Sequence, residues 1–175
     1  GSTVVRPHPR DPQPASLALM TGLALYEAVA PLLSPPQVPM LKWPNDLMLG
    51  SAKLAGILLE REGDAIVVGV GVNLAAAPDL PDRETVALSA FGPAPDRDHF
   101  VHGLAASFDR ELDRWRTYGL EPIVRRWEEV AHPAGTRLTV HPPGEEPITA
   151  EFAGLTAEGA LSLRLADGAR RVIHA

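Results

Sequence analysis

The sequence contains no cysteine, so a disulfide framework, a thiolate zinc site and a cysteine nucleophile are all excluded. It also lacks an uninterrupted run near the roughly 20 apolar residues that a membrane-spanning helix needs. The first residues, Gly1–Pro7, do not follow the charged and then apolar plan of a signal peptide. These absences predict a protein of the reducing cytoplasm without a membrane span.

Positive charge is also scarce. The 175 residues include 22 acidic and 16 Lys or Arg side chains, which gives a formal net charge of −6. Surfaces that bind nucleic acids or anionic membranes in general work through Lys and Arg that neutralise phosphates. We therefore expect neither kind of partner. The hydrophobic share of 45% is typical of a folded globular chain.

Hydrophobic patterning in the first half predicts strands around one helix. A short strand is expected over 3–6, and apolar positions at three- and four-residue steps predict a helix over 15–33. Two β-rich runs, 54–60 and 65–74, predict a hairpin. The second run is almost continuously apolar, so we expect a central strand covered on both faces. Residues 75–97 predict a long loop of the kind that often carries function.

The second half changes from helices to strands near His132–Gly135. One helix is expected from Asp96 or Asp98 to Tyr118, with a solvated charged face, and another over 121–131. The charged face would consist of Arg110, Glu111, Asp113, Arg114 and Arg116. Short strands over 136–141, 148–153, 161–165 and 170–173 predict a small antiparallel sheet or barrel. We therefore divide the chain into domains 1–132 and 133–175.

Lysine occurs only twice, as Lys42 and Lys53, both among apolar residues. Two partly desolvated ammonium groups on neighbouring strands would favour an anion between them, such as a phosphate or carboxylate. Alternatively, each lysine extends from a strand edge into water. Trp43-Pro44-Asn45-Asp46 could likewise be a well-made turn, or a site where Asn45 binds a base and Asp46 orients a lysine. The spacing leaves both interpretations open.

Three ordered blocks resemble biotin protein ligase: Lys42–Asp46 (KWPND), Lys53–Glu60 (KLAGILLE) and Gly69–Leu74 (GVGVNL). Similarity continues to Gly154-Leu155 and Glu158–Leu161, so it covers nearly the whole chain. The resemblance implies the α+β fold of biotin and lipoate ligases, which is class II synthetase-like. In that fold a mixed β-sheet packed with helices is followed by a small C-terminal SH3-like β-barrel.

The resemblance also implies an activity. Biotin and ATP, with Mg²⁺, would form biotinyl-5′-AMP, and biotin would then pass to a lysine of the biotin carboxyl carrier protein of acetyl-CoA carboxylase. Cations are needed where a carboxylate approaches a triphosphate, and Lys53, Lys42 and Asp46 would be the catalytic residues. Biotin contacts would come from Lys53, Gly56, Leu58, Gly69 and Gly71, and ATP or adenylate contacts from Lys42, Trp43, Asn45, Lys53 and Asn73.

The family also has a Gly- and Arg-rich loop before the strand at 3–6 and a strand beyond residue 175. We therefore expect this chain to lack the N-terminal part of the catalytic domain and the last strand. No helix-turn-helix is visible, and an edge strand could pair two copies into a homodimer. The alternatives are a lipoate-type protein ligase or acyltransferase, and a noncatalytic fragment that binds a nucleotide or a carrier protein.

Overall fold

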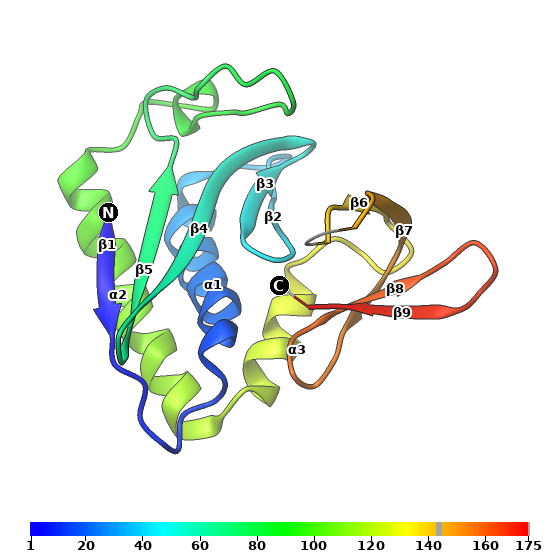
Figure 1. The fold of residues 1–175 in the computed structure, drawn as a ribbon. Coiled ribbons are helices and arrows are strands. Elements are labelled where there is room, and N and C mark those ends of the chain that lie inside the picture. Colours follow the sequence, from blue (N-terminus) through cyan, green and yellow to red (C-terminus); the bar gives the residue numbers. More distant parts are fainter. Residues whose placement is uncertain (143–144, 175) are drawn as a thin grey trace.

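A computed structural model describes residues 1–142 and 145–174, which form two antiparallel sheets and three α-helices (Figure 1). The first sheet contains β1 (Ser2–Val5), β2 (Pro39–Lys42), β3 (Asp46–Leu49), β4 (Ala52–Glu62) and β5 (Ala65–Val72). The second contains β6 (Arg137–Val140), β7 (Ile148–Leu155), β8 (Leu161–Arg164) and β9 (Arg170–Ile173). The helices are α1 (Leu17–Val29), α2 (Arg97–Tyr118) and α3 (Glu121–Glu129), with short 3₁₀ turns η1 (Pro14–Ser16), η2 (Ala30–Leu32) and η3 (Leu88–Ala90).

The first sheet has the strand order β1-β5-β4-β3-β2, and all its neighbours run antiparallel. The expectation of a mixed sheet is therefore wrong. Strands β2 to β5 follow one another through tight turns, and such short connections can join only antiparallel strands. Within residues 1–142 and 145–174, parallel pairing is limited to the isolated bridges Leu41–Ala131 and Lys53–Thr85.

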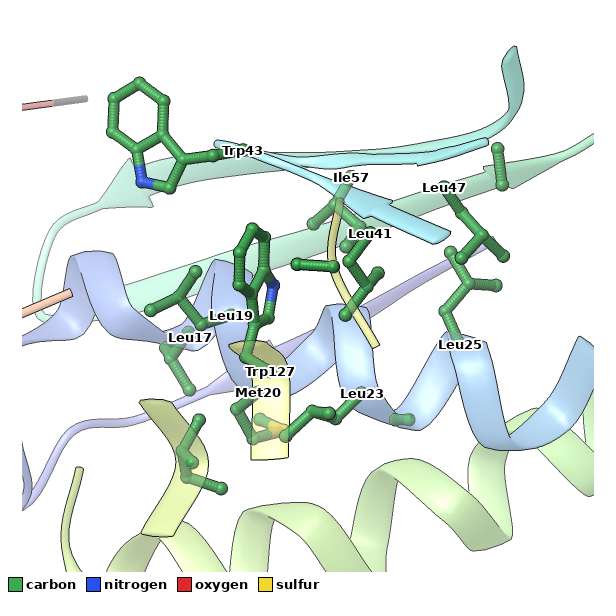
Figure 2. Close-up of a cluster of buried hydrophobic side chains, with 14 of the residues drawn as sticks. Leu17, Leu19, Met20, Leu23, Leu25, Leu41, Trp43, Leu47, Ile57 and Trp127 are labelled. Atoms are coloured by element: carbon green, nitrogen blue, oxygen red, sulfur yellow. The ribbon is translucent and has the colours of Figure 1, made fainter. Parts of the chain in front are cut away.

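Helix α1, the predicted helix of the first half, forms the centre of the hydrophobic core. Leu41 and Leu47 of the sheet, Leu25 of α1 and Trp127 of α3 are buried in one cluster, which Figure 2 shows. The segment Pro14–Leu32 is long and apolar enough to cross a membrane, which the sequence analysis did not expect. However, 56% of its most apolar window is buried inside the protein, as in a core helix.

The two faces of the first sheet differ in their cover. Ile66 and Val68 of β5 are buried on the α1 side, whereas Leu58 of β4 is 58% exposed on the opposite face. That opposite face, called the open face below, also carries Gly69, because Leu58 and Gly69 are register partners. Strand β5 lies inside the sheet between β1 and β4, as expected, but the expectation that it is covered on both faces is wrong, because α1 covers only one side of the sheet.

The charged side of α2 is not simply a solvated face. Glu111 is fully buried and accepts hydrogen bonds from Arg114 and, at 2.5 Å, from Arg126 of α3. Arg126 also donates to Glu27 of α1 at 2.7 Å. Arg110, Asp113 and Arg116 remain exposed, as expected. The sequence interpretation is therefore wrong for Glu111, whose charge joins three helices.

The second sheet, called the C-terminal sheet below, has the strand order β6-β7-β8-β9. The predicted strands agree with it to within about two residues. In the described ranges β6 and β9 each have a single strand neighbour, so a closed barrel is not confirmed. Phe152 of β7 packs edge-on against Trp127 of α3, with ring centroids 6.4 Å apart.

Candidate active site

A cleft of about 470 Å³, called the central cleft below, lies between the first sheet and the C-terminal sheet. The first sheet contributes Lys42, Asp46, Met48 and Lys53, and the turn between β2 and β3 contributes Trp43. The loop after β5 contributes Asp82, Arg83 and Glu84, and the C-terminal sheet and its ends contribute Thr139, Val140, His141, Ile173 and His174. Both lysines of the chain therefore lie in one site, as their pairing in the sequence predicts.

Strand register places the charged residues side by side. Lys42 is opposite Asp46 in the β2–β3 pair, and Asp46 is opposite Gly56 in the β3–β4 pair. Directly opposite residues point to the same face of a sheet. Lys53 reaches this face too, because its Nζ lies 2.5 Å from Oδ1 of Asp46. The strand of Asp46 therefore lies between the strands of the two lysines, and the Asp46 carboxylate forms an ion pair with Lys53.

Gly56 creates the space into which Lys53 extends. A Cβ atom at position 56 would lie 2.8 Å from Nζ and 3.0 Å from Cε of Lys53. It would also lie 3.5 Å from Oδ1 of Asp46. Contacts this short are rarely tolerated by real side chains, so any larger residue would displace the ammonium group. The glycine of the KLAGILLE block is thus explained by the lysine three residues before it.

The predicted biotin contacts share the open face of the sheet. Gly56 is opposite Gly71, and Leu58 is opposite Gly69. Two glycines side by side leave the backbone of β4 and β5 open to a flat ligand. These four residues form a strip that continues along the sheet from Lys53. Lys53 lines the central cleft, and the four residues of the strip do not. Contact between these residues and biotin stays a prediction.

The amides of Asn45 and Asn73 have partners within the protein. Nδ2 of Asn45 donates to the Ile57 carbonyl at 2.7 Å, and Nδ2 of Asn73 donates to the Val86 carbonyl at 3.0 Å. Asn45 thereby ties the KWPND turn to β4, and Asn73 ties the end of β5 to the following loop. The predicted contacts of both residues with adenine stay predictions.

The loop after β5 is anchored beside Lys53 and adds residues that the sequence analysis missed. The Lys53 N–H donates to the Glu84 carbonyl at 2.9 Å, and the Val86 N–H donates to the Lys53 carbonyl at 3.0 Å. This brings Arg83 to the cleft, where the hydrogen bond with Asp82 and the charge of Asp46 raise the pKa of its guanidinium. Arg83 is the only basic residue between 75 and 96. This isolated positive charge in a long loop is the sequence signal that could have marked Arg83 as a candidate site residue.

His132 lies at the junction of α3 and the C-terminal sheet. Burial, together with the positive charge of Lys42, lowers the pKa of its imidazole below the ordinary value of 6.5. This junction is held against β2 of the first sheet, because the Leu41 N–H donates to the Val130 carbonyl at 2.9 Å. The neutral form of His132 is therefore the one that the fold favours.

Comparison with known proteins places these features in a family. The model of the biotin/lipoate A/B protein ligase family matches residues 8–74. The chain is 37% identical to the biotin–[acetyl-CoA-carboxylase] ligase of Paracoccus denitrificans, covering 100% of this chain and 77% of that protein. It is 33% identical to the Mycobacterium tuberculosis ligase of the same name, covering 90% of this chain and 59% of that protein.

The fold is shared with solved structures as well. The biotin protein ligase of Aquifex aeolicus in complex with biotin and ATP superposes with a TM-score of 0.84 at 23% identity. The match covers 99% of this chain and 74% of that one. Since the identity to the Paracoccus ligase extends over the whole of this chain and most of that protein, the chain belongs to the family of biotin protein ligases.

Proposed function

We propose that this chain joins biotin and ATP into biotinyl-5′-AMP and then transfers biotin to a lysine of the biotin carboxyl carrier protein of acetyl-CoA carboxylase. The observation that carries this proposal is the placement of Lys42 and Lys53 on either side of Asp46, in a cleft beside a glycine-lined sheet face. The Paracoccus relative is a ligase of that name, which favours biotin over lipoate.

In the first half-reaction a carboxylate oxygen of biotin attacks the α-phosphorus of ATP. A new O–P bond forms, the bond from the α-phosphorus to the bridging oxygen breaks, and pyrophosphate leaves. Both reactants are anions, so their approach requires positive charge that is already in place. Lys53 supplies it where the strip of glycines meets the cleft, and Lys42 supplies it on the other side of Asp46.

In the second half-reaction a neutral lysine amine of the carrier protein attacks the carbonyl carbon of the adenylate. The C–N bond forms, the bond from that carbon to the phosphate oxygen breaks, AMP leaves and the nitrogen loses a proton. The attacking lysine must reach the acyl carbon from solvent. The open face of β4 and β5 is exposed to solvent at Leu58 and Gly71, so a ligand bound on it would stay accessible to the carrier protein.

The described residues do not by themselves form a Mg²⁺ site. They contain no group of three or more His, Asp or Glu side chains placed to hold a metal ion, and one oxygen of Asp46 already binds Lys53. Any Mg²⁺ would then be held mainly by phosphate oxygens of ATP and by water, as is usual for this ion, and would help to neutralise the triphosphate.

We also propose the finer features of the family for this chain. The C-terminal sheet would be the SH3-like module of the family. In support, β6 and β9 are the opposite edges of this sheet, yet both line the central cleft, so the sheet curves toward a barrel. The domain division at 132/133, a cytoplasmic location and a homodimer formed through a sheet edge are further proposals. The lack of cysteine supports the location, and the exposed Val4 on the edge strand β1 supports the dimer.

The proposed function is tested by measuring biotin-dependent pyrophosphate release in wild type, Lys53→Ala and Arg125→Ala. Removing one preorganised charged contact costs roughly 3 to 4 kcal/mol in the transition state, so Lys53→Ala should be slower by two to three orders of magnitude. Arg125→Ala removes an exposed positive charge on α3 and should leave the rate unchanged.

Calorimetry with biotin, lipoate and ATP separates the alternatives. Heat with biotin that disappears in Lys53→Ala supports the biotin ligase. Binding of lipoate but not biotin would instead assign a lipoate-type ligase. Binding of ATP with neither acid, and without pyrophosphate release, would assign a noncatalytic nucleotide-binding fragment.

A further inference from the structure

Trp43 belongs to the KWPND block, yet its indole N–H is directed to the C-terminal sheet. Nε1 of Trp43 donates to the carbonyl of Gly159 at 3.2 Å, across 116 positions of sequence. The residue is only 8% exposed, although it lines the central cleft. In Figure 2 its ring lies at the margin of the buried cluster, apart from Trp127. The polar group of Trp43 therefore serves a contact between the two sheets.

The acceptor lies in a well-defined turn, called the 156–160 turn below. The Gly159 N–H donates to the Thr156 carbonyl at 2.9 Å, and the Thr156 N–H donates to the Ala160 carbonyl at 2.8 Å. Gly159 has φ of +83°, and a Cβ there would lie 2.7 Å from Cδ1 of Leu19 in α1. The turn is thus fixed by its own hydrogen bonds and seated on α1, with the Gly159 carbonyl facing Trp43.

A second contact holds the C-terminal sheet at α3. Oε1 of Glu128 accepts a hydrogen bond from the Leu155 N–H at 2.6 Å. At Gly154, which has φ of +99°, a Cβ would lie only 2.6 Å from the same oxygen. Glu128 and Trp43 are therefore two separate attachment points, and only Trp43 lines the central cleft.

The position of the C-terminal sheet sets one wall of the cleft. Val140, His141 and His174 line it from that side, and Lys42, the residue before Trp43, lines it from the other. A bond from Trp43 to the C-terminal sheet therefore fixes the distance between the Lys42 strand and this wall. The predicted biotin contacts Leu58, Gly69 and Gly71 lie outside the cleft lining, so the wall faces the nucleotide side of the site.

We infer that Trp43 is a positioning residue. Its indole N–H holds the C-terminal sheet at the distance from Lys42 that ATP requires in the central cleft. This inference rests on the proposed function, because ATP is the ligand assigned to the cleft. Trp43→Phe tests it, since phenylalanine keeps an apolar ring and removes the donor. The KM for ATP should rise roughly 2- to 10-fold, the range expected for one neutral hydrogen bond. The kcat and the KM for biotin should change less than 2-fold.

Trp115→Phe is the matched control. Nε1 of Trp115 also donates a buried hydrogen bond, to Oγ of Ser16 at 2.9 Å, but Trp115 lies in α2 and does not line the cleft. It should lower the melting temperature without changing the KM for ATP. Amide hydrogen exchange in the 156–160 turn should become faster in Trp43→Phe and stay unchanged in Trp115→Phe.

Two results would overturn the inference: a Trp43→Phe variant whose KM for ATP equals that of wild type, or one whose kcat and both KM values change together. Either result leaves the proposed function intact as long as wild type releases pyrophosphate in a biotin-dependent manner. If wild type releases none, the proposed function fails. ATP affinity by calorimetry, compared between Trp43→Phe and Trp115→Phe, then decides the inference alone.

Discussion

At the scale of single residues, the contact between Gly56 and Lys53 is the most sensitive point of the site. In Gly56→Ala the new methyl group would clash with the Lys53 ammonium, whose Nζ lies 2.8 Å from the ideal Cβ position and would have to shift. A displacement of about 1 Å at a reacting centre can cost about 100-fold in rate. We therefore expect pyrophosphate release to fall about 100-fold in Gly56→Ala, measured at saturating biotin and ATP.

Gly103→Ala provides the control for this substitution. A Cβ at position 103 of α2 meets nothing within 4 Å, and alanine in a helix is more stable than glycine by roughly 0.5 to 1 kcal/mol. The variant should keep the wild-type rate and melt slightly higher. A Gly56→Ala enzyme with the wild-type rate would show that Lys53 does not need its observed position.

Single residues also show where sequence reasoning succeeds and where it ends. The pairing of Lys42 with Lys53 could be predicted because both belong to short blocks close together in the sequence, although the strands that carry them, β2 and β4, are not neighbours as expected but flank β3. The partners of Trp43 and Arg83 could not, because they depend on how a distant turn and a long loop return to the sheet. Such contacts leave no periodic pattern in the sequence.

At the scale of secondary-structure elements, Glu111 joins α1, α2 and α3 through its two arginine partners. Its side chain is 0% exposed, whereas that of Arg126 is 28% exposed, so part of the charge pairing is screened by water. Glu111→Gln keeps the size of the side chain and removes its charge. We expect it to lower the free energy of unfolding by about 2 kcal/mol, the range for hydrogen bonds to charged groups.

Urea denaturation measures this loss as a lower midpoint at an unchanged slope. Asp113→Asn, an exposed carboxylate on the same helix, should change stability by less than about 0.5 kcal/mol. Equal midpoints for Glu111→Gln and wild type would mean that the buried ion cluster contributes no net stability.

The positions of the helices and strands could largely be predicted, whereas their layering could not. Asp96 caps α2 by accepting from the His99 N–H, and Gly119 ends that helix at φ of +78°, both as local sequence signals predict. Burial of Glu111 and exposure of one sheet face depend instead on which element packs on which. The charge pattern of α2 is the same for a solvated face and for a face that meets Arg126 of α3.

At the scale of the whole molecule, the stability of the fold should depend on pH through His132, at the junction of the two sheets. Burial and the charge of Lys42 lower the pKa of His132 in the folded protein below 6.5. Between that lowered value and 6.5 the unfolded chain binds more protons than the folded one, so stability rises with pH. Folding stability should therefore fall as the pH is lowered through 6.5, and the added loss should stop below the folded pKa.

His132→Gln removes this proton-linked loss, so the stability difference between pH 7.5 and pH 5.5 should be smaller in the variant than in wild type. Lys42→Met removes one of the two causes and should raise the pKa of His132 partway toward 6.5, as a histidine NMR titration would show. Comparing each variant with itself at two pH values cancels any uniform destabilisation by the substitution. A larger pH dependence in His132→Gln, or a His132 that titrates above 6.5, would contradict the packing of this histidine beside Lys42.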